Sequence, residues 1–139
     1  MNELNTTAVT EAIDQYDNAF NKGLDTIKAN QDRFIESMNE SLDNHSSNPE
    51  RIEAISTHSI ERAYKSATEN HNEHLLKLYV LLGKQAVQDD PELAKFVMDG
   101  CQGNIDAIVA RLKKILTCSQ DYIAQLEKLR ERVTELLGE

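Results

Sequence analysis

An apolar heptad runs through the C-terminal third of the chain and constrains its fold more than any other feature. Counted in alternating steps of four and three residues, twelve consecutive steps keep the register, and Ser119 is the only polar residue in the series. The positions are Ala94, Met98, Cys101, Ile105, Ile108, Leu112, Ile115, Ser119, Tyr122, Leu126, Leu129, Val133 and Leu136. This period is typical of long helices packed side by side, and it predicts a helical protein.

The chain contains few residues that break helices, and its two prolines stand in equivalent contexts. With 5 glycines and 2 prolines in 139 residues, the elements should be few and long. Pro49 follows Asn48, and Pro91 follows Asp90. Asparagine and aspartate cap helix N-termini, and proline is favoured at the first helical position, so both prolines predict helix starts. The expected helices cover residues of about 6–44, 49–88 and 91–137.

The third expected helix carries apolar residues beside its heptad. Val109, Leu116 and Ile123 fall at the e position. An a/d/e stripe is wider than a two-stranded seam requires, so it favours a helix with two or more neighbours. Because short connections join long helices, we predict an all-α fold: an antiparallel bundle of three long helices with coiled-coil-like packing, in a single domain spanning 1–139. The surplus apolar residues also predict a homo-oligomer, most simply a two-fold dimer through this helix.

A four-helix alternative arises from the glycines inside the third segment. Gly100 and Gly103 lie three residues apart, and glycine commonly follows the last turn of a helix. Asn104 would then cap a further helix. The heptad stays in phase across both glycines, which favours a continuous helix, and the alternative stays open.

The acidic balance of the chain argues against several classes of partner. The formal net charge is −9, and residues 1–48 hold nine acidic and three basic side chains. Binding to a phosphate backbone needs a basic stripe, so we expect no nucleic-acid partner. No stretch approaches the roughly 18 consecutive apolar residues of a transmembrane helix, and the N-terminus lacks the basic and apolar regions of a secretory signal. We therefore expect no membrane association and a cytoplasmic location, with export by a route without a cleaved signal left open.

Two histidines interrupt the apolar pattern of the second segment. His71 and His74 lie three residues apart, on one face of a helix. If a tight turn at residues 89–90 closes this helix against the third, His71 faces Ile108. Cys101 would complete a His/His/Cys set of the kind that binds zinc. A metal- or small-ligand site of His71, His74 and Cys101 is the alternative to ordinary packing, in which the histidines are hydrogen-bonded or partly exposed.

An acidic row lies on the first helix. Asp32, Glu36 and Glu40 are spaced four residues apart. Like charges at this spacing slightly destabilise a helix, so helix formation does not explain the row. It is either a solvated face or an interaction face for a basic partner. Together with the e-position residues of the third helix, it forms the candidate partner-binding surface.

The sequence carries no motif for catalysis. It contains no G-x-S-x-G, G-x-x-x-x-G-K-[ST], G-x-G-x-x-G or H-E-x-x-H pattern. On one continuous helix Cys101 and Cys118 would stand about 25 Å apart, so unless the chain folds back between them we expect two reduced thiols rather than a disulfide. We expect no enzymatic activity and no cofactor. The predicted function is a non-catalytic helical interaction protein, meaning an adaptor, escort chaperone or inhibitor, whose protein partner the sequence does not identify.

Overall fold

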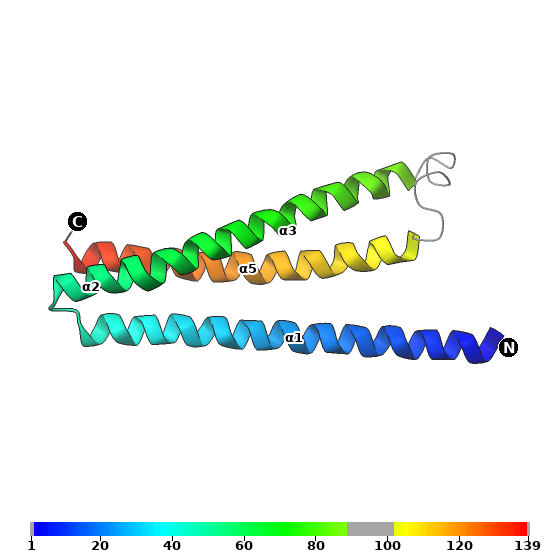
Figure 1. Ribbon diagram of the computed structural model, residues 1–139, viewed down its shortest axis with the longest axis horizontal. Helices are drawn as coiled ribbons and strands as arrows, with labels where there is room; N and C mark the ends of the chain where they lie inside the picture. Colours follow the sequence, from blue (N-terminus) through cyan, green and yellow to red (C-terminus); the bar gives the residue numbers. More distant parts are fainter. Residues whose placement is uncertain (1, 89–101, 139) are drawn as a thin grey trace.

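The computed structural model describes residues 2–88 and 102–138, which form an up-down-up arrangement of long helices (Figure 1). No strand occurs within these ranges. The predicted all-α bundle is confirmed. No helix in the described part of the chain is long and apolar enough to cross a membrane. The elements are α1 (Asn2–Asn44), α2 (Pro49–Ile55), the π-helical turn η1 (Ser56–Ile60), α3 (Glu61–Gln88) and α5 (Gln102–Leu136).

The direction of each helix follows from which residues meet. Between α1 and α5, contacts advance together along both helices, from Arg111 with Asp17 to Arg132 with Asn39, so these helices are parallel. The segment from α2 to α3 runs the opposite way, because it leaves α1 through a loop of a few residues at 45–48. Figure 1 shows α3 lying along α5 with the reverse direction.

The second helical segment begins where the sequence predicts. Asn48 has extended backbone, and its side-chain Oδ1 accepts a hydrogen bond from the Arg51 backbone N–H at 3.2 Å. Pro49 occupies the first helical position, where its missing N–H costs nothing. The equivalent prediction at Pro91 lies outside the described residues, as does the expected helix over 91–101. α5 begins within the described chain at Gln102.

A π turn interrupts the regular helix between α2 and α3. The backbone N–H of Glu61 bonds to the carbonyl of Ser56, five residues earlier. Ile52 and Ile60 are both fully buried and lie eight residues apart, a spacing that would turn the second side chain about 80° from the first in a regular α-helix. A π turn accommodates one extra residue. It therefore returns Ile60 to the face that Ile52 occupies.

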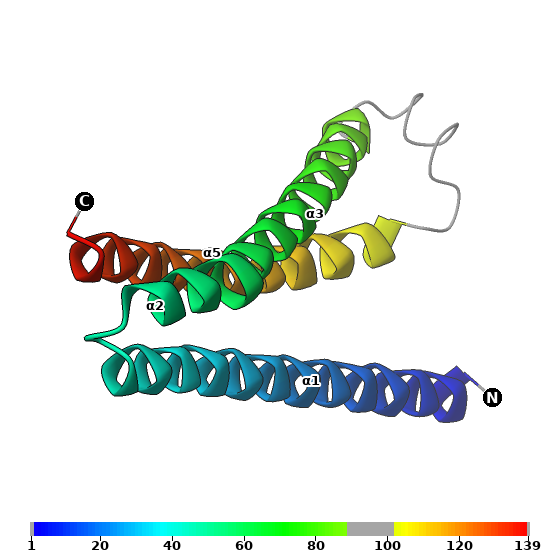
Figure 2. The ribbon, with the colours of Figure 1, turned by 60° about the vertical axis from the view of Figure 1, so that its left-hand side comes forward.

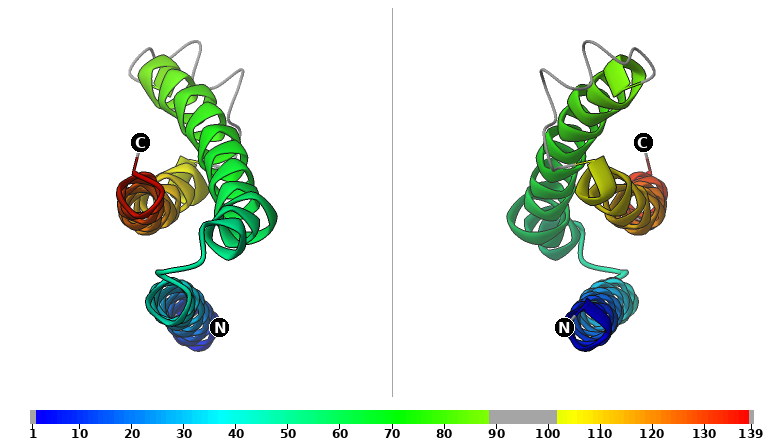
Figure 3. Two further views of the ribbon diagram at one scale, coloured as in Figure 1. Left: turned by 90° about the vertical axis from the view of Figure 1, so that its left-hand side faces the viewer. Right: turned by 90° about the vertical axis from the view of Figure 1, so that its right-hand side faces the viewer.

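The apolar core is divided into two clusters. At the end near the 45–48 loop, which we call the closed half, side chains from all three long helical segments pack together around Leu42, Ile52 and Leu126. At the other end, the open half, Leu78 of α3 packs against Leu112 of α5. No described residue of α1 belongs to this second cluster. Figures 2 and 3 show the reason: α3 moves away from α1 as it approaches Gln88.

The two glycines behind the four-helix alternative lie at the edge of the described residues. Gly103 lies in the first turn of α5, while Gly100 and Cys101 lie outside the described residues. The choice between a continuous third helix and a four-helix arrangement therefore also lies outside them. Gly138 follows the end of α5 with φ of +75°, and its N–H bonds to the carbonyl of Glu135. This left-handed residue terminates the helix.

Candidate functional site

The polar interruptions of the α3 and α5 stripes meet each other. His71 Nδ1 lies 2.7 Å from the Oγ of Ser119, the polar residue of the α5 heptad. Ser119 Oγ also lies 3.1 Å from the carbonyl oxygen of Leu116. A hydroxyl donates one proton, so both contacts are satisfied when Ser119 donates to Leu116 and accepts from His71. This arrangement requires a proton on His71 Nδ1.

The observed register differs from the one expected from a tight turn at 89–90. The expectation that His71 faces Ile108 is wrong, because Ser119 stands eleven residues further along α5. Residues 89–101, which join α3 to α5, lie outside the described residues, so the observed register comes from the contacts of the two helices themselves. Gly103 lies 16 residues before Ser119, which is about 24 Å along a helix. Gly103 therefore does not lie at the level of His71.

The two histidines do not converge within the described chain. His74 Nδ1 lies 2.8 Å from the carbonyl oxygen of Asn70, one turn earlier in its own helix, whereas His71 turns to α5. No group of three His, Cys, Asp or Glu residues suited to a metal ion occurs in the described ranges. Cys101, the third member of the alternative site, lies outside them.

Cys118 extends the polar contacts to α1. It is buried, and its thiol donates to Gln31 Oε1 at 3.4 Å. Burial raises the pKa of the Cys118 thiol, and the nearby Lys28 ammonium opposes this only in part. A neutral thiol at physiological pH is a poor nucleophile. We call Gln31, His71, Cys118 and Ser119 the polar layer, because they lie between the two apolar clusters.

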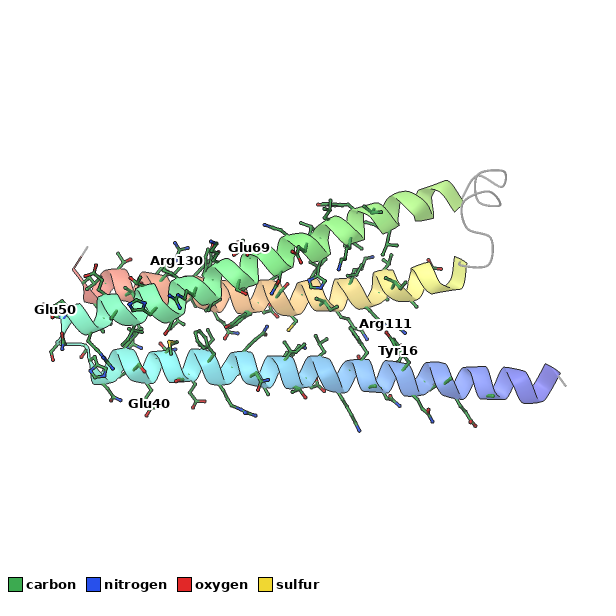
Figure 4. The ribbon with its side chains drawn as sticks, viewed as in Figure 1. Tyr16, Glu40, Glu50, Glu69, Arg111 and Arg130 are labelled. Atoms are coloured by element: carbon green, nitrogen blue, oxygen red, sulfur yellow. The ribbon has the colours of Figure 1, made fainter. Side chains whose placement is uncertain are left out.

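The acidic row lies on a solvated surface. Asp32, Glu36 and Glu40 are all exposed. In Figure 4, Glu40 points away from α2 and α5. Glu40 therefore lies on the outer side of α1, whereas Asp32 lines a groove between α1 and α5 with Cys118 and Asp121.

The e-position residues are covered by the chain itself. Val109 and Leu116 retain 5% and 8% of their exposure and belong to the α3–α5 cluster with Leu78. The expectation that these two side chains exceed what the neighbouring helices cover is wrong, because α3 packs over them. Ile123 is partly buried, in a shallow groove between α3 and α5 that His71 also lines.

The exposed large apolar residues gather mainly in the open half. On α3, Leu76, Tyr79 and Val80 are 65%, 62% and 53% exposed. Their spacing of three and four residues places them on one face, which we call the α3 stripe. Residues 75–82 contain a single polar residue, Lys77, so this stretch is apolar on all sides. That pattern is typical of a helix with neighbours on more than one side. The remaining exposed members are Tyr16, Ile27, Leu82 and Ile108.

Polar contacts fasten α1 to α5 in the open half. The Arg111 guanidinium stacks on the Tyr16 ring at 4.2 Å and pairs with Asp17 at 2.7 Å (Figure 4). Arg130 repeats the stacking on Tyr64 in the closed half, also at 4.2 Å. Partly exposed stacks and ion pairs contribute about 0.2–1 kcal/mol each. The N-terminal half of α1 is therefore held more weakly than its C-terminal half, which shares the closed core.

Comparison with known proteins identifies no relative. A scan against protein-family models, a search of curated proteins and a search of solved structures each found no match. The proposals below therefore depend on the surface and the contacts of this chain.

Proposed function

We propose that the protein is a non-catalytic interaction module that binds a helix of another protein on its α3 stripe, as an adaptor, escort chaperone or inhibitor does. The observation that supports this is the exposure of Leu76, Tyr79 and Val80 on one face of α3. Single exposed apolar residues are ordinary, whereas a contiguous group is typical of interaction surfaces. An amphipathic helix recognises such a surface with its own apolar face.

The partner's chemistry follows from the charges beside the stripe. Glu73 and Glu69 are exposed and lie about one and two turns before Leu76, on the same side of α3. Figure 4 places Glu69 on the surface of α3. We therefore propose a partner helix with an apolar face and a basic flank. The acidic row on α1 would attract the same partner and accelerate its association.

The apolar stripe also explains why self-association is expected. Without a partner, two copies cover the stripe by pairing through α3 in a two-fold dimer. The proposed dimer contact lies on α3 and not on the third helix, because Val109 and Leu116 are already buried within one chain.

The test is co-purification with a matched pair of variants. The tagged protein should capture a partner from extract, and Leu76→Ser/Tyr79→Ser should lose it. Ser66→Ala/Asn72→Ala, at exposed polar positions of the same helix, should retain it. A peptide of the partner's amphipathic helix should bind the wild-type protein and fail with the serine variant. Capture that survives the serine substitutions would overturn the proposed surface.

Charge reversal tests the contribution of the acidic row. Asp32→Lys/Glu36→Lys/Glu40→Lys should slow association and weaken its salt dependence. The row takes no part in the proposal if the association rate is unchanged at low ionic strength.

The metal-binding alternative has less support. His71 and His74 each have a polar contact at hydrogen-bond distance, to different groups. Elemental analysis of the purified protein and a melting temperature measured with added zinc decide the question. Zinc that raises the melting temperature of the wild-type protein but not of His71→Ala/His74→Ala would favour the alternative.

A further inference from the structure

The polar layer lies between a cluster built from three helical segments and a cluster built from two. On one side, Leu42, Ile52 and Leu126 join three helical segments in one cluster. On the other, Leu78, with Leu112 and its neighbours, joins only α3 and α5 among the described residues. The layer consists of hydrogen-bonded pairs instead of apolar contacts. Apolar packing is therefore not continuous from one half to the other.

The two halves also differ in how completely their core residues are buried. Leu42, Ile52, Ile60 and Leu126 are completely buried in the closed half. The buried residues of the α3–α5 cluster keep 5–8% of their exposure. Regions with fewer buried apolar contacts open at lower free energy than the global unfolding. The hydrogen bonds of the layer add little to prevent this, because each contributes a net ~0.5–1.5 kcal/mol.

We propose that the polar layer is a joint about which the open half opens as a unit. In the opened form, residues 75–82 of α3 separate from residues 109–116 of α5, and their helical hydrogen bonds break because unpacked helices of this length are marginal. The closed half stays packed. Opening exposes Leu78 and Leu112 beside the α3 stripe, and so enlarges the apolar surface. The joint follows from the packing of this chain and does not depend on whether a partner binds.

The layer can act in this way because it fixes the alignment of the helices without bonding them strongly. A polar pair in an apolar seam favours the one register in which both groups are satisfied. His71 and Ser119 form such a pair. The open half therefore returns to the same register each time it closes.

Native-state hydrogen exchange at increasing urea concentration tests the joint. The amides of residues 75–82 and 109–116 should share one opening free energy and one weak dependence on urea. Their protection should be at least about tenfold lower than that of residues 60–67 and 122–133, which should exchange by global unfolding. Equal protection and equal urea dependence in both halves would overturn the proposal.

A matched pair of variants tests whether the polar layer causes the difference in protection between the two halves. His71→Leu/Ser119→Leu replaces the polar contact with apolar packing, so it should raise protection in the open half selectively and reduce the difference between halves. Asn72→Leu/Gln120→Leu adds the same side chains at the adjacent exposed positions, and should leave the difference unchanged. A difference that survives in the first variant would show that the layer is not the joint. If that variant misfolds by circular dichroism, exchange in the wild-type protein still decides whether the halves open separately.

Discussion

At the level of single residues, the polar and glycine positions that depart from the apolar pattern have distinct structural roles. Ser119 and His71 each interrupt an apolar stripe, and the structure pairs them at 2.7 Å. Both interruptions are visible in the sequence, although their pairing is not. Gly23 and Gly138 look alike in the sequence and differ in the fold, because only Gly138 has a positive φ.

Replacing these two glycines should have opposite effects. Gly23 is exposed within α1, and a Cβ added there meets nothing within 4 Å. Gly23→Ala should therefore stabilise the protein by about 0.5–1 kcal/mol through helix propensity. Gly138→Ala should destabilise it by roughly 1 kcal/mol, because a side chain strains the left-handed conformation. Urea unfolding measures both, and equal shifts in one direction would contradict the argument.

Burial of Cys118 predicts a loss of stability at alkaline pH. The pKa of the thiol is raised in the folded state, so the folded protein holds this proton more tightly than the unfolded chain. The resulting stability is present below the unfolded pKa, near 9, and is lost as the pH rises through the folded pKa. Urea unfolding in a Cys101→Ser background should show this decline.

Cys118→Ala is the control for the alkaline prediction. In the same Cys101→Ser background it should make the decline smaller without abolishing it, because burial also raises the pKa of Tyr122. An unchanged slope between pH 8 and 10 would show that the thiol does not titrate differently on folding.

At the level of the helical element, the π turn keeps the apolar residues on one face where their spacing in the sequence is irregular. The apolar residues of the second segment advance from Ile55 to Ile60 in a step of five, where steps of three and four are usual. That step is the sequence signal for η1. The turn keeps Ile60 in the closed core, so the extra residue affects only the exposed side, at Thr57 and His58.

Deleting His58 should therefore be tolerated. With one residue fewer, α2 and α3 can join as a continuous α-helix, and Ile52 and Ile60 keep the same face. We expect a change of less than about 1 kcal/mol in the free energy of unfolding, because an exposed side chain is lost. Deletion of Asn72, where the helix has no extra residue, should rotate the following apolar residues by about 100° and cost several kcal/mol. Similar losses for the two deletions would contradict this account.

At the scale of the whole molecule, the divergence of α3 from α1 separates a three-helix core from a two-helix one (Figure 3). It leaves apolar side chains exposed on different helices, including Tyr16 on α1 and Ile108 on α5. Further association would cover this surface. The acidic side chains Glu36 and Glu40 of α1 stay exposed to solvent.

Light scattering at tens of micromolar should report the mass of a dimer for the isolated protein. Leu76→Ser/Tyr79→Ser should shift the mass to that of a monomer, because it removes the apolar surface proposed for pairing. Val109→Ala is the control: its side chain lies inside one chain, so it should lower stability without changing the mass. A monomeric wild-type protein would contradict the proposed dimer.

Local sequence patterns predict the all-α class, the helix start at Pro49, and the polar positions His71 and Ser119 of the layer. These are local properties, set by the capping residues, the apolar period and the scarcity of helix breakers. The register of the helices, the divergence of α3 and the burial of Val109 and Leu116 depend on how the helices pack. A repeating apolar pattern is satisfied nearly as well after a shift of one heptad. The partner of each residue therefore depends on the connection lengths and on which polar groups are satisfied together, as His71 and Ser119 are.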